Sequence, residues 1–291
     1  MILIKKIEQI AISGRGSRRE IANFVLQYDY SLAAKTVDEI ACKTYTSKAS
    51  VVRFAKELGF KGWREFCQSF SKEQQFLEFH KGDINANYPF KKDDTFSTIL
   101  ANMKKLEIQS LEITNYLFKQ KSLEEAAEII ANSKIITLYA ESPNNYLAEL
   151  FKRKLLSIGK QSVVFRDDEL GIETGTLTQN DCAIIISYSG NEKSRAVRHI
   201  NLLHSNKIPV IGITSNTDNF LREHADISLL IASEENLYTK IAAFQTETSI
   251  EFILNVLFAL VFQRDFDRNQ YYHLDSARYL EMNRSNNNLN S

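Results

Sequence analysis

The hydrophobic residues in the first quarter of the chain recur mainly every three or four positions, which is the period of an amphipathic helix. This spacing predicts an all-α segment built from consecutive short helices. The groups that carry the period are Ile7, Ile10 and Ile12, then Ile21 to Leu26, then Val37 to Ala41, and then Val51 to Leu58.

Residues 79–95 interrupt this period with Gly82, Pro89 and a cluster of Asp, Asn and Lys, so we predict a linker there. Helical spacing resumes over about 95–132. These helices lie between two differently patterned regions and are too apolar for a free tether. We therefore hypothesise that they carry any coupling between the two regions.

Beyond residue 132 the pattern changes to short, continuous apolar runs separated by helical stretches. Such runs are typical of parallel strands that helices cover on both faces. The sequence thus predicts a multidomain chain, with an all-α domain followed by an α/β domain. The predicted strands are 134–139, 162–165, 182–187, 208–214 and 226–232, and the helices are 147–158, closed by Gly159, 193–203 and 244–262.

Cysteine usage and hydropathy indicate the cellular compartment of the protein. The three cysteines (Cys42, Cys67 and Cys182) lie far apart and form no CxxC pair, which favours reduced, buried thiols over a disulfide or zinc framework. No apolar run approaches the roughly 18–20 residues that span a bilayer, and the first residues lack a signal-peptide cleavage region. We expect a cytoplasmic protein with no membrane partner, metal or cofactor.

The charge is balanced overall but not along the chain. The sequence has 36 basic and 36 acidic residues, yet residues 1–72 hold 13 Lys and Arg against 7 Asp and Glu, a net charge of +6. A basic first quarter is typical of a nucleic-acid-binding module joined to something else. A chance excess on a solvated face would look the same, so the motifs must decide.

Residues 36–66 contain the parts of a helix-turn-helix. Thr36 with Glu39 forms a capping-box pattern at the start of one helix, and Ser47 can cap the next. The N-terminal end of a recognition helix meets base edges in the major groove. The predicted DNA-binding residues are Ser47, Lys48, Ala49, Ser50 and Arg53, with Lys56 and Lys61 available for phosphates.

The string RF-x-K-x-LGF-x-G-W-x-EF (53–66), preceded by Ile40, Ala41, Ser47 and Ser50, resembles the N-terminal domain of the RpiR family of transcription regulators. The resemblance covers residues 1–72 and implies a double-stranded DNA operator as partner. Tyr45 departs from it, because the family turn usually has a left-handed glycine. We expect Trp63 to anchor the core, and Arg53 to contact DNA unless it pairs with Glu57.

The run DCAIIISYSG (181–190) predicts a buried strand that ends in a hydroxyl-rich turn, followed by a helix from about Lys193. Backbone N–H groups at such a helix start, with Ser187, Ser189 and Gly190, would suit a phosphate. Thr214 and Ser215 end the next strand at the same edge, where open α/β sheets bind ligands.

The strings ISYSG (186–190) and V-x-x-I-x-x-L-x-x-x-x-K-x-P-V-I-G-I-T-S (197–215) resemble the sugar isomerase (SIS) domain. This resemblance implies a five-stranded parallel sheet, a homodimer or homotetramer, and a phosphorylated sugar effector that changes operator affinity. The predicted boundaries are 1–78 for the DNA-binding domain, 79–95 for the linker, 96–282 for the SIS domain (core about 125–262) and 283–291 for a disordered tail.

Two departures from the SIS pattern concern the ligand. Ala140, Ser142 and Asn144 stand in the loop where glycines and a serine are usual, and Glu192 stands where a hydroxyl usually ends the phosphate motif. We still place Ser142, Asn144 and Glu192 in the candidate ligand site. A carboxylate about 4 Å from a phosphate repels it by roughly 1 kcal/mol in water. Either Glu192 turns away, or the ligand is unusual, or ligand sensing has been lost.

A phosphosugar isomerase or ether hydrolase on the same fold is the alternative, since such chemistry needs a positioned carboxylate or histidine. No motif selects one candidate, so we expect a regulator and not an enzyme. The available groups are Glu149, Glu192, Glu234, Glu235, His199 and His204.

Overall fold

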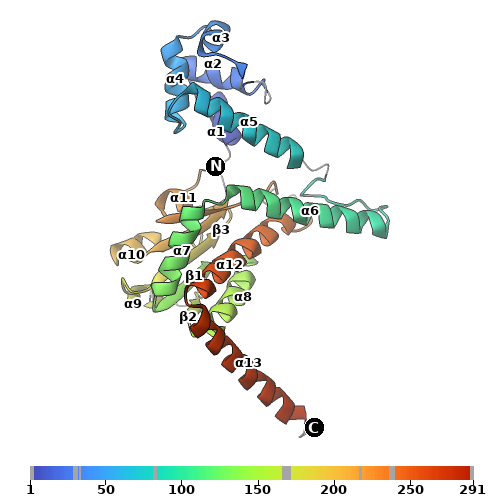
Figure 1. Cartoon of the computed structure of the whole chain (residues 1–291), viewed down its shortest axis with the longest axis vertical. Coiled ribbons are helices and arrows are strands. Elements are labelled where there is room, and N and C mark those ends of the chain that lie inside the picture. Colours follow the sequence, from blue (N-terminus) through green and yellow to red (C-terminus); the bar gives the residue numbers. More distant parts are fainter. Residues whose placement is uncertain are drawn as a thin grey trace. The chain divides into compact units, whose positions relative to one another are not determined.

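The computed structural model describes the chain except for residues 1–2, 29–31, 33, 81–83, 166–171, 216–217, 236–239 and 289–291. Its contacts divide the chain into two compact units, residues 1–83 and 84–291 (Figure 1). The linker predicted at 79–95 spans this division. Each unit is described by itself.

The first unit consists of helices around one apolar core. Ile7, Ile21, Ile40 and Phe66 are fully buried in that core. Trp63 is buried as predicted, and its ring N–H donates to the Lys35 carbonyl at 3.2 Å. The helices are α1 (Leu3–Ser13), α2 (Gly16–Val25), α3 (Val37–Lys43), α4 (Lys48–Glu57) and α5 (Trp63–His80).

Helices α3 and α4 form the predicted helix-turn-helix. The Thr36 capping box is complete, because its hydroxyl accepts from Glu39 N and the Glu39 carboxylate accepts from Thr36 N. Ser47 caps α4 by accepting from Ser50 N at 3.1 Å. Between the helices Tyr45 adopts the left-handed conformation, with φ of 51°. The turn therefore keeps the shape that favours glycine, with a tyrosine in its place.

The second unit is built on a five-stranded parallel sheet with strand order β2-β1-β3-β4-β5. All five strands predicted from the apolar runs are present. Continuous burial along β3 and β4 explains their unbroken apolar sequences. The strands are β1 (Ile135–Ala140), β2 (Gln161–Val164), β3 (Cys182–Ser187), β4 (Val210–Ser215) and β5 (Ile227–Ile231).

Helices cover both faces of this sheet, as the sequence predicts. Figure 1 shows α7 (Gln120–Asn132), α8 (Asn144–Ser157) and α12 (Phe244–Arg264) on one side, where they share a core with β1, β3, β4 and β5. The other face packs against α9 (Ile172–Thr176), α10 (Ile200–Ser205) and α11 (Phe220–His224). Gly159 ends α8 with φ of 74°, which confirms the predicted cap.

Two long helices complete the second unit. Helix α6 (Phe96–Leu117) packs against α12 and β5, and α13 (Phe266–Asn288) follows α12. Within the described residues, α12 is long and apolar enough to cross a membrane, but Ile250, Ile253 and Leu257 are fully buried in the domain core. Core packing therefore accounts for its composition.

Two predicted segments differ from the structure. The helix expected from Lys193 begins only at Ile200, because residues 192–199 form consecutive turns. That prediction was wrong for its first part, and no regular helix start faces the hydroxyl turn. Helix α13 continues to Asn288, so the segment predicted to be disordered from 283 is helical as far as the structure describes it.

Candidate DNA-binding surface and ligand cavity

The predicted DNA-binding residues lie on the outer face of α4 and just beyond it. Lys48, Ala49, Arg53 and Lys56 are exposed, whereas Val51, Phe54 and Ala55 turn into the core. Lys61 is exposed in the turn that precedes α5. Amphipathic spacing thus leaves one polar, cationic face available for a groove of DNA.

Three of these residues also have contacts within the unit. The hydroxyls of Ser47 and Ser50 lie 2.9 Å apart at the cap of α4, and Lys48 Nζ lies 2.7 Å from Asp38 Oδ1. Both partners of this ion pair are exposed, so the pair contributes little to stability. Glu57 pairs with Arg18 at 3.3 Å, so it is not the partner of Arg53.

In the second unit, a cavity of about 460 Å³ opens at the carboxyl edge of the sheet. Its walls come from the segments that follow β1, β2 and β3. In the strand order β2-β1-β3 the chain leaves β1 and β3 toward opposite faces, which makes this edge the topological switch point where open α/β sheets bind ligands. The lining consists of Ala140, Glu141, Ser142, Asn145, Glu149, Val164, Phe165, Arg195 and Ala196.

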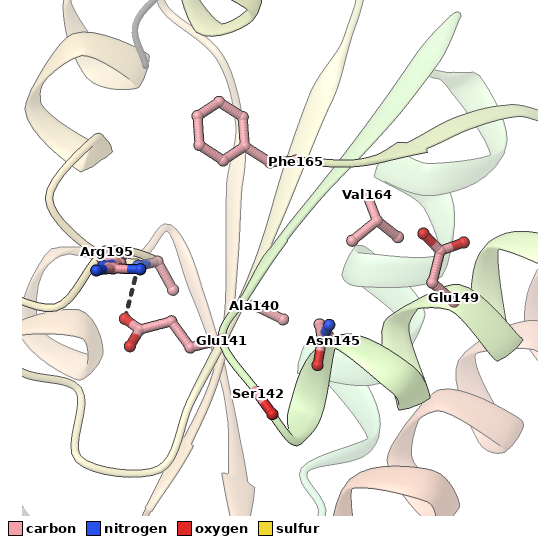
Figure 2. Close-up of a pocket in the computed structure, with 9 residues that line it drawn as sticks. Ala140, Glu141, Ser142, Asn145, Glu149, Val164, Phe165 and Arg195 are labelled. Carbon is pink, nitrogen blue, oxygen red and sulfur yellow. Dashed lines mark hydrogen bonds between the residues drawn. The ribbon is translucent and has the colours of Figure 1, made fainter. Parts of the chain in front are cut away.

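Glu141 links two of the loops around this cavity. Its Oε1 accepts from the backbone N–H of Ala196 at 3.1 Å, the dashed contact in Figure 2. Glu141 directly follows β1, and Ala196 belongs to the turns that follow β3. Figure 2 shows Glu141 directed toward the Arg195 side of the cavity. The carboxylate therefore lies between the loops that follow the two central strands.

Two further acceptors come from α8, across the cavity from Glu141 (Figure 2). The Asn145 side-chain oxygen is buried and finds no hydrogen-bond donor among the described residues. Glu149, one turn further along α8, accepts from Lys152 at 3.0 Å. A buried acceptor without a partner costs about 1–3 kcal/mol.

The apolar wall of the cavity is Val164 with Phe165. The Phe165 ring stacks on the buried Tyr139 ring, with 4.8 Å between the ring centroids. It also contacts the His199 ring, whose centroid is 5.0 Å away. Tyr139 is fixed in turn by a 2.9 Å contact between its hydroxyl and that of Thr174. These ring contacts hold Phe165 at one side of the cavity.

The hydroxyl turn after β3 lies beside this cavity but does not line it. Ser187, Thr214 and Ser215 are buried, and Ser187 Oγ accepts from Gly190 N at 3.3 Å. Thr214 Oγ1 donates to the Tyr188 carbonyl at 3.4 Å. The hydroxyls of Ser187 and Thr214 therefore bond to the backbone of the turn.

Gly190 serves the packing of this same turn. A Cβ added there would lie 1.9 Å from Asn219 Oδ1, and Gly190 also has φ of 58°. Asn219 caps α11 by accepting from Arg222 N at 3.0 Å. The close approach of Asn219 and the left-handed backbone thus explain why a glycine stands here.

The remaining predicted ligand residues are distributed around the edge. Ser142 lines the cavity, whereas Asn144 begins α8. Ser189 and Glu192 are exposed on the turn after β3 and are not part of the lining. The structure therefore brings Ser142 to the cavity and leaves the hydroxyl turn as a separate, adjoining feature.

Sequence reasoning missed Glu141, Asn145 and Arg195 as cavity residues, and it considered Glu149 only as a candidate for proton transfer. The useful signal was the position of Glu141 and Asn145 immediately after a predicted strand. Arg195 gave no such signal, because it lies in turns that were predicted to be helix.

Glu235, another candidate for proton transfer, has a structural role. Its carboxylate is buried and accepts from Gln245 N at 2.5 Å and from the Thr246 hydroxyl at 2.7 Å, and Lys240 lies 3.2 Å away. It therefore satisfies one of the free N–H groups at the start of α12. Among the described residues, no group of three or more His, Cys, Asp or Glu side chains could hold a metal ion.

These features define a class of protein, in which a helix-turn-helix DNA-binding unit is joined to a doubly wound α/β unit with a cavity at its switch point. Comparison with known families agrees with this organisation. Residues 1–75 match the helix-turn-helix domain of the rpiR family, and residues 129–260 match the SIS domain. The chain thus combines an rpiR-family helix-turn-helix domain with a SIS domain, and curated proteins similar to it are HTH-type transcriptional regulators.

Relatives share both units. An uncharacterized HTH-type transcriptional regulator of Caldanaerobacter subterraneus is 27% identical over 97% of this chain and 98% of its own length. The Vibrio vulnificus NanR protein, solved in complex with ManNAc-6P, aligns over 96% of this chain and 97% of its own, with a TM-score of 0.59 and 20% identity. The sugar isomerase domain of an RpiR transcription factor from Sphaerobacter thermophilus covers 62% of this chain and 98% of its own, with a TM-score of 0.54 and 17% identity.

Proposed function

We propose that this regulator binds a double-stranded DNA operator through α4, and that a phosphorylated sugar at the carboxyl edge of the sheet alters its operator affinity. The observation that carries the proposal is the cavity at the switch point of the sheet, in a chain that also has an exposed recognition helix. NanR, a similar protein, was solved with a phosphorylated sugar, which supports the choice of ligand class.

On the DNA side, Arg53 is the main candidate for base contact, because it is exposed on α4 and Glu57 is paired elsewhere. Ser47, Lys48, Ala49 and Ser50 form the end of α4 that would enter the major groove. Lys56 and Lys61 would contact phosphates.

On the ligand side, the proposed site joins the cavity to the turn that follows β3. Ser142 and Asn144 border the loop after β1, while Ser189 and Glu192 lie exposed on the turn after β3. The buried Ser187, Gly190, Thr214 and Ser215 hold the shape of that turn. The protein would work in the cytoplasm as a homodimer or homotetramer, and the ligand would act as an effector and not as a substrate.

The test is operator binding by the full chain. Fluorescence anisotropy with labelled DNA from upstream of the neighbouring genes should show saturable binding, and a sugar phosphate should change the affinity about 5- to 150-fold. Arg53→Ala should weaken binding about tenfold or more. Lys121→Ala, an exposed cation on α7, is the matched control and should bind as the unchanged protein does.

Two outcomes would contradict this function. If the protein bound none of the upstream DNA fragments, these fragments would contain no operator for it, and the proposed regulation of the neighbouring genes would be wrong. Conversion of an aldose phosphate to its ketose by the purified chain, followed by NMR, would favour the isomerase alternative.

A further inference from the structure

The polar lining of the cavity consists mainly of hydrogen-bond acceptors. Glu141 and Glu149 contribute two carboxylates. Among the described residues, the cationic side chain in the lining is Arg195. Charge in this described part of the lining is therefore net negative, in a domain whose proposed effector is itself an anion.

A phosphate group fits poorly inside such a cavity. The backbone N–H of Ala196 would suit an anion, but the Glu141 carboxylate already accepts from it at 3.1 Å. A phosphate would have to displace that carboxylate or lie close to it, and like charges at such distances repel more strongly as water is excluded. The Glu141 carboxylate thus disfavours the phosphate end of a ligand in this cavity.

We propose that the cavity binds the sugar end of the effector and selects for a free, protonated amino group on the ring, with the phosphate outside, at the turn after β3. The proposal rests on the function proposed above and specifies the ligand class. It separates three kinds of sugar phosphate: those with an ammonium, those with a hydroxyl and those with an N-acetyl group at the same carbon.

The geometry supports an ammonium in particular. Only Oε1 of Glu141 takes part in the contact with Ala196, so Oε2 remains placed to accept from a ligand. An ammonium offers three N–H donors and a positive charge, which the carboxylates complement. A hydroxyl offers one donor and no charge. An N-acetyl group also offers one donor, and it adds bulk beside Phe165.

The experiment measures binding of matched ligands to the full chain by isothermal titration calorimetry at slightly acidic pH, where the amine is protonated. The probes are glucosamine 6-phosphate, N-acetylglucosamine 6-phosphate and glucose 6-phosphate, with the corresponding manno series to cover the ring epimer. At least one amino sugar phosphate should bind about tenfold or more tightly than its hydroxyl and N-acetyl counterparts, the increment of one charge-assisted hydrogen bond.

Two variants test whether Glu141 causes the preference for the amino sugar phosphate. Glu141→Gln keeps an acceptor for Ala196 N–H but removes the charge, so it should reduce the preference for the amine to about twofold or less without weakening the hydroxyl sugar. Glu223→Gln, an exposed carboxylate on α11, should retain the full preference. Melting curves check that both variants fold.

The outcomes separate this proposal from the function on which it rests. Equal affinity for the three ligands of each series, or tightest binding of the N-acetyl sugar, overturns the amine preference, while an accompanying change in operator affinity would leave the regulator function intact. Binding of none of the six overturns the amine preference, while operator binding by the same protein would leave the DNA-binding part of the proposed function intact. A preference that survives Glu141→Gln overturns the assignment to Glu141.

Discussion

At the scale of single residues, Tyr45 is the clearest conflict between local conformation and side chain. It lies in the turn before the recognition helix with φ of 51°, and its side chain is 98% exposed. Its neighbours hold the turn from within, since the hydroxyls of Thr44 and Thr46 lie 2.8 Å apart and Thr46 N donates to the Ala41 carbonyl. A tyrosine that packs against so little does not offset the cost of a left-handed backbone.

Tyr45→Gly should therefore stabilise the DNA-binding unit by about 1 kcal/mol, because glycine adopts this conformation without steric cost. Urea unfolding followed by tryptophan fluorescence measures this unit selectively, since Trp63 is the single tryptophan and lies in its core. Tyr45→Ala is the control. It removes the ring but keeps a Cβ, so its unfolding free energy should rise little. An equal rise in unfolding free energy for both variants would show that the ring, and not the left-handed backbone, causes the destabilisation.

At the scale of elements, Glu73 ties the first helix of the DNA-binding unit to the last. Its carboxylate on α5 accepts from Leu3 N at 2.8 Å and from Ile4 N at 2.9 Å, which satisfies two N–H groups at the start of α1. Burial raises the pKa of Glu73, although the two N–H bonds work in the opposite direction. The folded unit therefore binds this proton more tightly than the unfolded chain does.

This raised pKa predicts a pH-dependent stability. The contribution of Glu73 is fully present below its unfolded pKa, near 4.5, and is lost as pH rises through the higher folded pKa. Glu73→Gln lacks this titration, so the unfolding free energy of the natural protein should fall relative to that of the variant as pH rises above about 4.5. Urea unfolding monitored at Trp63 measures the difference. If the unfolding free energy of the natural protein rose relative to that of the variant as pH increased, the effect of the N–H bonds on the Glu73 pKa would outweigh the effect of burial.

The secondary-structure elements differ in how well the sequence predicted them. The strands were predictable because buried parallel strands are continuous apolar runs, as in Cys182–Ser187 and Val210–Ser215. The segment before Ile200 was not, since Val197, Ile200 and Leu203 keep helical spacing while the backbone forms turns, one of whose N–H groups bonds to Glu141. The cavity depends on those turns, so its lining could not be derived from periodicity.

At the scale of the whole molecule, apolar surface remains on two helices of the second unit. Phe96 and Leu100 on α6 are exposed, as are Tyr271, Leu274 and Tyr279 on α13. Large exposed apolar side chains that recur along one helix are typical of protein interfaces. Helix-turn-helix proteins also bind paired half-sites as twofold dimers.

We therefore expect a mass in solution of at least twice 33.4 kDa, measured by light scattering coupled to size-exclusion chromatography. Leu274→Glu places a charge on α13 and should shift the population toward the monomer. Leu202→Glu, at a half-exposed apolar position on α10, should leave the mass unchanged. A monomeric natural chain at tens of micromolar would contradict an interface on α13.

The contact between Gly190 and Asn219 bears on how such sequences are compared. Gly190 is required by a neighbouring side chain and a left-handed backbone, and Ser187 and Thr214 bond within the same turn. A search by the S-x-S-G string therefore selects chains that fold this turn, whatever molecule they bind. We expect the ligand to depend instead on the cavity residues 141 and 145. Sorting relatives by those two positions should group them by effector chemistry where the turn motif groups them only by architecture.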